Sequence, residues 1–309
     1  MKGPLFYAKI LLFGEYGIIK DSKGLAIPYN SYKGALKKSE NLTDIAKKSN
    51  QNLQKFYHYL QNLNNENLVS FRLNEFKADI DAGMYFDSSI PQGYGVGSSG
   101  ALVASIYDKY AINKITVLEN LTRDKLLKLK EIFSLMESFF HGKSSGLDPL
   151  NSYLSIPILI NSKDNLEATG IPSQREGKGA VFLLDSEIIG ETEPMVNIFM
   201  NKMKNEGFRK MLNEDFAKFT DACIDDFLHG NVKSLFENVK QLSKVVLDNF
   251  QPMIPKRFHT IWQKGLESND YYLKLCGSGG GGYILGFTED FNKTKSILNE
   301  YKLELVYRF

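Results

Sequence analysis

The stretch PQGYGVGSSG at residues 91–100 contains four glycines and two adjacent serines, and the more apolar segment ALVASIYDKY follows it directly. Such a stretch has almost no apolar side chain to bury, and glycine loses more entropy on ordering than any other residue. A glycine-rich loop that opens a helix offers backbone N–H groups and the positive end of the helix dipole to an anion. The hydroxyls of Ser98 and Ser99 can add contacts to phosphate oxygens or to Mg²⁺. The alternative is an ordinary turn with a serine cap, and this loop alone does not decide between the two.

The composition is that of a globular protein in water. The 309 residues are 43% apolar and 24% charged, and 38 Lys and Arg nearly balance 36 Asp and Glu. This balance argues against partners such as nucleic acid or anionic lipid. The two cysteines, Cys223 and Cys276, have no paired spacing, which argues against a zinc site or a disulfide framework. We expect a cytoplasmic protein without a signal peptide or membrane helix, because Lys9 interrupts the first apolar run and no run approaches 18–20 residues.

The pattern of apolar residues predicts a mixed α and β protein in two lobes. The polar stretch PSQREGKG at 172–179 is the predicted boundary, giving domains 1–178 and 179–309. Helices are expected at 40–63, 99–112, 122–142 and 231–250. Strands are expected at 68–73, 83–90, 151–160, 180–188 and 302–309, with a strand, turn and strand over 6–20.

Three short motif matches point to other chemistries, and we rank them low. G-x-G-x-x-G occurs at Gly95, Gly97 and Gly100 and again at Gly277, Gly279 and Gly282. A dinucleotide site requires a strand leading tightly into the loop and an acidic residue about 20 positions on. Pro91 and Gln92 intervene before the first match, and the region about 20 positions beyond it is predicted to be helical or loop. The segment GKSSG at 142–146 formally matches a hydrolase nucleophile elbow around Ser144, with His229 or His259 as base, but a long predicted helix precedes it where a strand is needed.

Two carboxylates and one lysine are the candidates for chemistry. Glu137 lies near the end of a predicted helix and Asp148 lies just beyond the following loop, so they could converge, one as a magnesium ligand and the other beside the reacting group. The alternatives are a solvated helix residue and a turn former before Pro149. Lys9, within FYAKILLF, either faces water from a half-exposed strand or supplies a positive charge to an active site.

Together these segments resemble the GHMP kinases, a superfamily that includes galactokinase, homoserine kinase, mevalonate kinase and phosphomevalonate kinase. KILLFGEYGII (9–19), PQGYGVGSSGA (91–101) and KLCGSGGGGY (274–283) look like the three family motifs, in the family's order. ESFFHGKSSGLDPLNSY (137–153) looks most like mevalonate kinase, in which a helix glutamate lies eleven positions before an aspartate, as Glu137 does before Asp148. GETEPMV (190–196) resembles the segment that opens the C-terminal lobe of mevalonate kinases. Tyr16 departs from the family, which usually has histidine at this position near the acceptor.

The resemblance implies an α+β fold of two lobes, with an N-terminal lobe like ribosomal protein S5 domain 2 and a ferredoxin-like C-terminal lobe. It implies transfer of the γ-phosphoryl group of ATP to an alcohol, with the 5-hydroxyl of mevalonate as the first candidate acceptor. Phosphomevalonate kinases share the form G-S-S-G-A and are the second candidate, followed by other GHMP sugar or alcohol kinases. The remaining alternative is a non-catalytic sensor that binds ATP. The resemblance is also compatible with a homodimer.

The site residues are carried over position by position. Asp148 would accept or orient the alcohol proton, and the charge of Lys9 would favour the ionised Asp148 and steady the transferring group. Ser99 and Glu137 would hold Mg²⁺, and Glu15, Tyr16 and Thr192 would lie at the acceptor. The third motif, with Gly277, Gly279 and Gly280, would pack beside the phosphate loop. The residues that would wrap the ATP phosphates are Gly93, Gly95, Gly97, Ser98, Ser99, Gly100 and Ala101.

Overall fold

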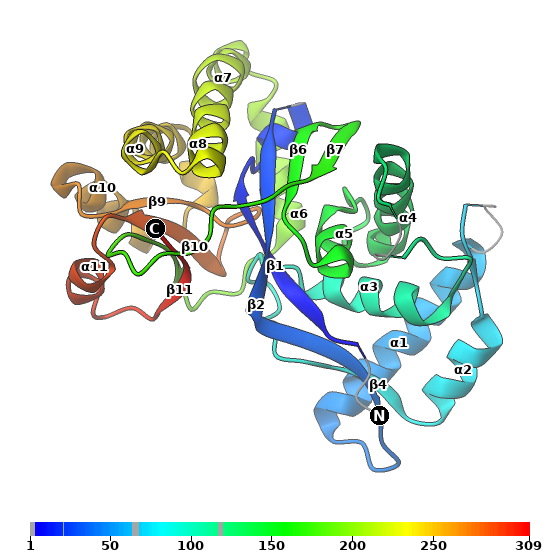
Figure 1. Ribbon diagram of the computed structural model, residues 1–309. Helices are drawn as coiled ribbons and strands as arrows, with labels where there is room; N and C mark the ends of the chain where they lie inside the picture. The colour runs from blue at the N-terminus through cyan, green and yellow to red at the C-terminus, as the bar shows by residue number, and fades with distance from the viewer. Residues whose placement is uncertain (1–3, 21, 64–67, 117–119) are drawn as a thin grey trace. The chain divides into compact units, whose positions relative to one another are not determined.

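The computed structural model describes residues 4–20, 22–63, 68–116 and 120–309 (Figure 1). The chain divides into two compact units. The first unit comprises the described residues of 1–9, 28–91 and 97–156, and the second those of 10–27, 92–96 and 157–309. Strands β1 (Phe6–Phe13) and β2 (Gly24–Lys38) contribute residues to both units, so the units interleave along the chain. The predicted domains, by contrast, divide the chain once at 178/179, and that division stays a prediction.

The first unit is mainly helical. Residues 34–38 of β2 pair antiparallel with β4 (Met84–Ser88), and α1 (Asp44–Leu63) packs against β4. The apolar face of α1, which includes Leu53 and Phe56, is buried. The predicted helix at 40–63 is therefore confirmed from Asp44 onward. The glycine-rich loop opens α3, which packs against α4 and α5. The remaining elements are α2 (Leu73–Asp81), α3 (Ser98–Tyr110), α4 (Arg123–His141), α5 (Leu147–Leu154) and the small sheet of β3 (Ser70–Phe71) with β5 (Ala111–Ile112).

The second unit contains a four-stranded antiparallel sheet in the order β11 (Leu303–Arg308), β8 (Ala180–Asp185), β10 (Tyr283–Thr288) and β9 (Tyr272–Leu275). In chain order these are the fourth, first, third and second strands, with helices between the first and second and between the third and fourth. This is the ferredoxin-like arrangement, so the predicted C-terminal fold is confirmed. Residues 24–26 of β2 also pair with β6 (Ile158–Ser162), which pairs with β7 (Asn165–Ala168).

Most helices of the second unit come between β8 and β9 in the sequence. α9 packs on β9 with the predicted apolar stripe, including Leu235, Val239 and Leu242, buried. The α-helices are α6 (Thr192–Lys202), α7 (Glu206–Met211), α8 (Ala217–His229), α9 (Val232–Asn249), α10 (His259–Ser268) and α11 (Phe291–Ile297). Shorter turns are η1 (Gly17–Lys20), the π-helical η2 (Leu212–Phe216), η3 (Gln251–Met253) and η4 (Lys256–Phe258).

Three sequence-based predictions of strands need correction. Residues 151–154 end helix α5, and the strand begins only at Ile158. The expected strand at 68–73 is reduced to Ser70–Phe71, because Leu73 starts a helix that buries Phe76 and Ile80 one turn apart. The expected strand after Gly14 is the 3-10 turn Gly17–Lys20. In each case the apolar run is too short for its period to separate helix from strand.

Among the described residues, no helix has both the length and the apolar character needed to cross a bilayer.

Gly286 provides a test of the packing of this sheet. Gly286 lies opposite Phe182 in the β8–β10 pair, and a Cβ added to it would lie 2.1 Å from the Phe182 ring. Because Phe182 is fully buried, the ring has no room to move away. We expect Gly286→Ala to lower the free energy of unfolding by about 1–3 kcal/mol, measured by urea denaturation. Gly170→Ala is the matched control, since nothing lies within 4 Å of its added Cβ. Equal stability of the two variants would contradict this packing.

Candidate active site

A buried lysine and a carboxylate meet in the first unit. Lys9 is only 4% exposed and lies in β1 between Ala8 and Ile10, which are fully buried. Its Nζ is 2.8 Å from Oδ1 of Asp148, in the first turn of α5, whose side chain remains 34% exposed. A buried ammonium requires a paired anion, and the sequence pattern around Lys9 alone could not name one. The structure thus brings the two predicted catalytic residues together and leaves the carboxylate accessible.

Glycines allow the first turn of α3 to approach this pair. Gly97 has φ +79°, and an added Cβ would lie 3.1 Å from Cγ of Lys9 and 3.7 Å from Oδ2 of Asp148. An added Cβ on Gly100 would lie 2.7 Å from the Asp148 carbonyl carbon. A side chain at either position would therefore displace the ion pair or the backbone that carries it. The glycine pattern has a steric reason here, besides its capacity to bind an anion.

The predicted metal ligands also meet. Glu137, near the end of α4, is 3% exposed, and Ser99 Oγ donates to its Oε1 at 2.9 Å. Ser144 Oγ donates to Oε2 at 2.5 Å and accepts from the Gly146 N–H at 3.0 Å. Burial raises the pKa of Glu137 to about 7, and the nearby charge of Asp148 adds to this effect. Sequence reasoning considered Ser144 only as a nucleophile and missed its contact with Glu137.

The context of Ser144 does not fit a hydrolase. Helix α4 precedes it and helix α5 follows it, whereas a nucleophile elbow requires a strand before the serine. Each proposed base is engaged by backbone: His229 Nδ1 lies 2.7 Å from Asp225 O, and His259 Nε2 lies 3.0 Å from Ile254 O.

The donors around Glu137 fit a magnesium ion that is held partly by phosphate. They comprise one carboxylate and the hydroxyl of Ser99, at the start of a helix opened by a glycine loop. Mg²⁺ commonly takes one or two carboxylates and completes its shell with water and substrate phosphates. Within the described part of the chain, no group of three His, Cys, Asp or Glu side chains could hold a metal by itself.

Within α3, the predicted phosphate-binding residues differ in how far they are accessible to a ligand. Ser98 and Ser99 are only partly buried and belong to its first turn. Ala101, by contrast, is fully buried, and its N–H donates to Gly97 O at 3.0 Å. Ala101 therefore packs in the core and closes the first helical turn.

In the second unit, the two glycine loops pack on each other. An added Cβ on Gly95 would lie 2.5 Å from Cys276 O, and one on Gly282 would lie 2.4 Å from the Tyr94 Cα. Gly93 O accepts from the Gly190 N–H at 2.9 Å. Within the third motif, Gly280 N also donates to Met253 O at 2.6 Å. Residues 277–282 thus lie against residues 93–95, with backbone touching backbone.

The predicted acceptor residues Tyr16 and Thr192 share a neighbour. Tyr16 is buried with φ +59°, stacks on Phe199 at 4.6 Å between centroids, and donates its hydroxyl to Ser278 O at 2.7 Å. Ser278 Oγ lies 3.5 Å from Oγ1 of Thr192, the first residue of α6. The sequence analysis did not identify Ser278 as a candidate, although it lies within the third glycine motif.

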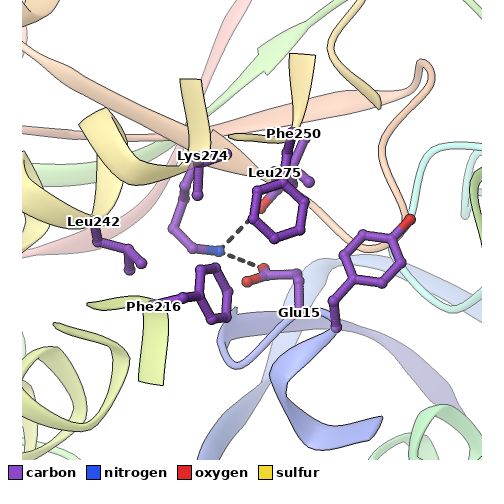
Figure 2. Close-up of a pocket in the computed structure, with 8 residues that line it drawn as sticks. Glu15, Phe216, Leu242, Phe250, Lys274 and Leu275 are labelled. Carbon is purple, nitrogen blue, oxygen red and sulfur yellow. Dashed lines mark hydrogen bonds and ion pairs between the residues drawn. The ribbon is translucent and has the colours of Figure 1, made fainter. Parts of the chain in front are cut away.

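Glu15, the third predicted acceptor residue, forms an ion pair with a buried side chain of the protein. Its carboxylate forms an ion pair with Nζ of Lys274, on β9, as the dashed line in Figure 2 shows. Lys274 is 2% exposed and Glu15 5%. Sequence reasoning missed Lys274 too, although it interrupts an apolar strand in the same way as Lys9.

Comparison with known proteins identifies the fold. Residues 55–155 match the family model of the GHMP kinases N-terminal domain. No curated protein sequence matches the chain. The fold is that of the GHMP kinases, and the predicted resemblance to that superfamily is confirmed.

Three solved structures illustrate the likeness. L. major mevalonate kinase in complex with R-mevalonate is 16% identical, with a TM-score of 0.64 over 97% of this chain and 93% of that one. Streptococcus pneumoniae phosphomevalonate kinase in complex with phosphomevalonate and AMPPNP is 13% identical, with a TM-score of 0.62 over 98% and 99%. Lactococcus lactis galactokinase complexed with galactose is 13% identical, with a TM-score of 0.62 over 98% and 92%.

The burial of Glu137 predicts a pH-dependent cost to folding. Its folded pKa of about 7 exceeds the ordinary value of 4.5, so the folded state holds more protons between these values and loses stability as pH rises through them. In metal-free buffer, we expect Glu137→Gln to raise the free energy of unfolding by about 1–3 kcal/mol at pH 8 and by little at pH 5, measured by urea denaturation. Glu131→Gln, at an exposed position of the same helix, is the control. A gain that is equal at both pH values would refute the burial argument.

Proposed function

We propose that this chain, which has the GHMP kinase fold and a GHMP kinase N-terminal domain, transfers the γ-phosphoryl group of ATP to the hydroxyl of a small molecule. The observation that carries the proposal is a single cluster in the first unit. It combines the Lys9–Asp148 ion pair, the Ser99–Glu137 hydrogen bond and the glycine turn that opens α3. Phosphoryl transfer depends mainly on positioning and charge neutralisation, so a few such groups suffice.

In this proposal each group has one task. The first turn of α3 binds phosphate oxygens through its N–H groups and its dipole. Ser99 and Glu137 hold Mg²⁺, which when bound neutralises charge on the β- and γ-phosphates. Asp148 accepts or orients the proton of the acceptor hydroxyl, and Lys9, 2.8 Å from it, stabilises negative charge on the transferring group. A non-catalytic sensor would have no need of all four side chains.

Mevalonate is the acceptor that we propose first. Its support is the eleven-residue spacing of Glu137 and Asp148 and the similarity to mevalonate kinase structures. Phosphomevalonate is the second candidate, because of the G-S-S-G-A form at 97–101 and the similarity to phosphomevalonate kinase structures. We place the enzyme in the cytoplasm, a location with which its two buried cysteine thiols are consistent.

The test is coupled ADP release by the purified protein with Mg²⁺-ATP and a panel of mevalonate, phosphomevalonate, galactose and homoserine. We expect turnover on mevalonate. Turnover on another alcohol only would retain the reaction and change the substrate. ATP binding without turnover on any member would contradict the proposed acceptors and favour the sensor.

Asp148 provides the test of mechanism. We expect Asp148→Asn to lower kcat about 10²–10⁴-fold, because the amide cannot accept the proton, while a fluorescent ATP analogue binds with nearly unchanged Kd. Asp87→Asn is the matched control, since it removes the carboxylate of an exposed ion pair with Lys37 in the same unit. Thermal unfolding shows whether both variants are folded. Wild-type turnover by a folded Asp148→Asn variant would exclude a catalytic role for this carboxylate.

A further inference from the structure

The buried ion pair between Glu15 and Lys274 is the feature of the second unit that the proposed reaction does not use. Removing two charges from water is costly, and only good geometry and additional hydrogen bonds offset that cost. The Lys274 ammonium has both, because it also donates to its neighbour Leu275 O at 2.9 Å and lies 5.9 Å from the centroid of the Phe13 ring. The pair joins positions 259 residues apart, on β9 and in the turn after β1.

The surroundings of the pair are apolar. Figure 2 shows Lys274 and Glu15 reaching toward each other across a small pocket, with Phe216, Leu242 and Phe250 around them. No other charged side chain lines this pocket in the described part of the chain. Phe216 belongs to the π-helical turn η2, and it lies 3.2 Å from the position of an added Cβ on Gly17. The turn at residues 14–17 is thus enclosed by packed side chains and fixed by one ionic contact.

Tyr16 is the residue that this turn presents. A non-glycine residue at φ +59° is strained by about 1–3 kcal/mol and needs surroundings that enforce its conformation. The Glu15 ion pair fixes the residue before it, and the hydrogen bond to Ser278 O and the stack on Phe199 fix the Tyr16 side chain.

We propose that Lys274 is a positioning residue that sets affinity for the acceptor: by holding the Glu15 carboxylate in the core it fixes Tyr16 against Ser278. Glu15 then acts through Lys274 and Tyr16 and does not itself contact the acceptor. This inference rests on the proposed function in one respect, that Tyr16 lies at the acceptor. The competing explanation is that Lys274 only blocks the edge strand β9 from pairing with other chains, a known use of an inward-pointing charge.

The first arm of the test does not depend on activity. The protein is labelled with 3-fluorotyrosine, and the ¹⁹F signal of Tyr16 is assigned with Tyr16→Phe. We expect Lys274→Met and the double variant Glu15→Met/Lys274→Met to shift or broaden this signal. Lys293→Met, which breaks the exposed ion pair with Asp270 in the same unit, should leave it unchanged.

The second arm measures kinetics with whichever acceptor the panel identifies. We expect both Lys274 variants to raise the acceptor KM about tenfold, the equivalent of one lost hydrogen bond, with kcat and the KM for ATP within about threefold of wild type. The double variant separates this effect from folding, because an apolar pair of similar volume removes the cost of an unpaired buried charge, and its unfolding temperature should exceed that of Lys274→Met.

The outcomes distinguish failure of the positioning role of Lys274 from failure of the proposed kinase function. A stable double variant with wild-type acceptor KM and an unchanged Tyr16 signal overturns the positioning role and leaves the edge-strand explanation. An altered Tyr16 signal with unchanged acceptor KM refutes the link to acceptor affinity. If no acceptor is turned over, the proposed function fails, whereas the ¹⁹F arm still decides whether the ion pair fixes Tyr16.

Discussion

The cost of burying a lysine ammonium governs both units of this protein. Lys9 and Lys274 each lie in an apolar strand, and each is almost fully removed from water. An uncompensated charge at either place would cost several kcal/mol, so the fold must deliver a carboxylate to each. Asp148 reaches Lys9 from the start of a helix, and Glu15 reaches Lys274 from a turn. The two pairs differ in one respect that suits them to different tasks: Asp148 remains partly accessible, whereas Glu15 does not.

For Glu137, the cost of burying the charge exceeds what its contacts return. Its carboxylate is buried among two serine hydroxyls, and these bonds together with the charge of Lys9 do not fully offset the loss of water and the repulsion from Asp148. A carboxylate buried in this way does not stabilise the folded protein, so its presence needs another explanation. It is well explained by a ligand that supplies positive charge, because pre-organised donors need no rearrangement when the ligand arrives.

The sequence predicted the fold class, and it singled out Lys9, Ser99, Glu137 and Asp148, which the structure brings into two close pairs. The catalytic role of these residues stays a proposal, whereas glycines, serines and carboxylates at fixed spacings constrain backbone as well as chemistry. Lys9 and Asp148 illustrate this, since their contact follows from motifs far apart in the chain. Short apolar runs were less informative, and residues 151–154 were assigned to a strand although they end a helix. Lys274 and Ser278 were missed for another reason, because their partners are far away in the sequence. Lys274 pairs with Glu15, and Ser278 O accepts from the Tyr16 hydroxyl, and these contacts form only when the chain is folded. Ser144 was noticed, but for a chemistry that requires a strand before it.

Gly100 joins two segments in a way that bears on how this protein can evolve. Its missing side chain lets the start of α3 rest on the backbone at Asp148 and Pro149. Any larger residue there would push away the carboxylate that the proposed reaction needs, so a change at one segment survives only with a compensating shift in the other. We therefore expect single substitutions to be poorly tolerated at this glycine of the proposed phosphate loop. Thr192, by contrast, meets a neighbouring side chain, Ser278, and positions of this kind can vary one at a time. Descendants of such a chain would be expected to vary at the proposed acceptor residues before they vary at the glycines of the proposed phosphate loop.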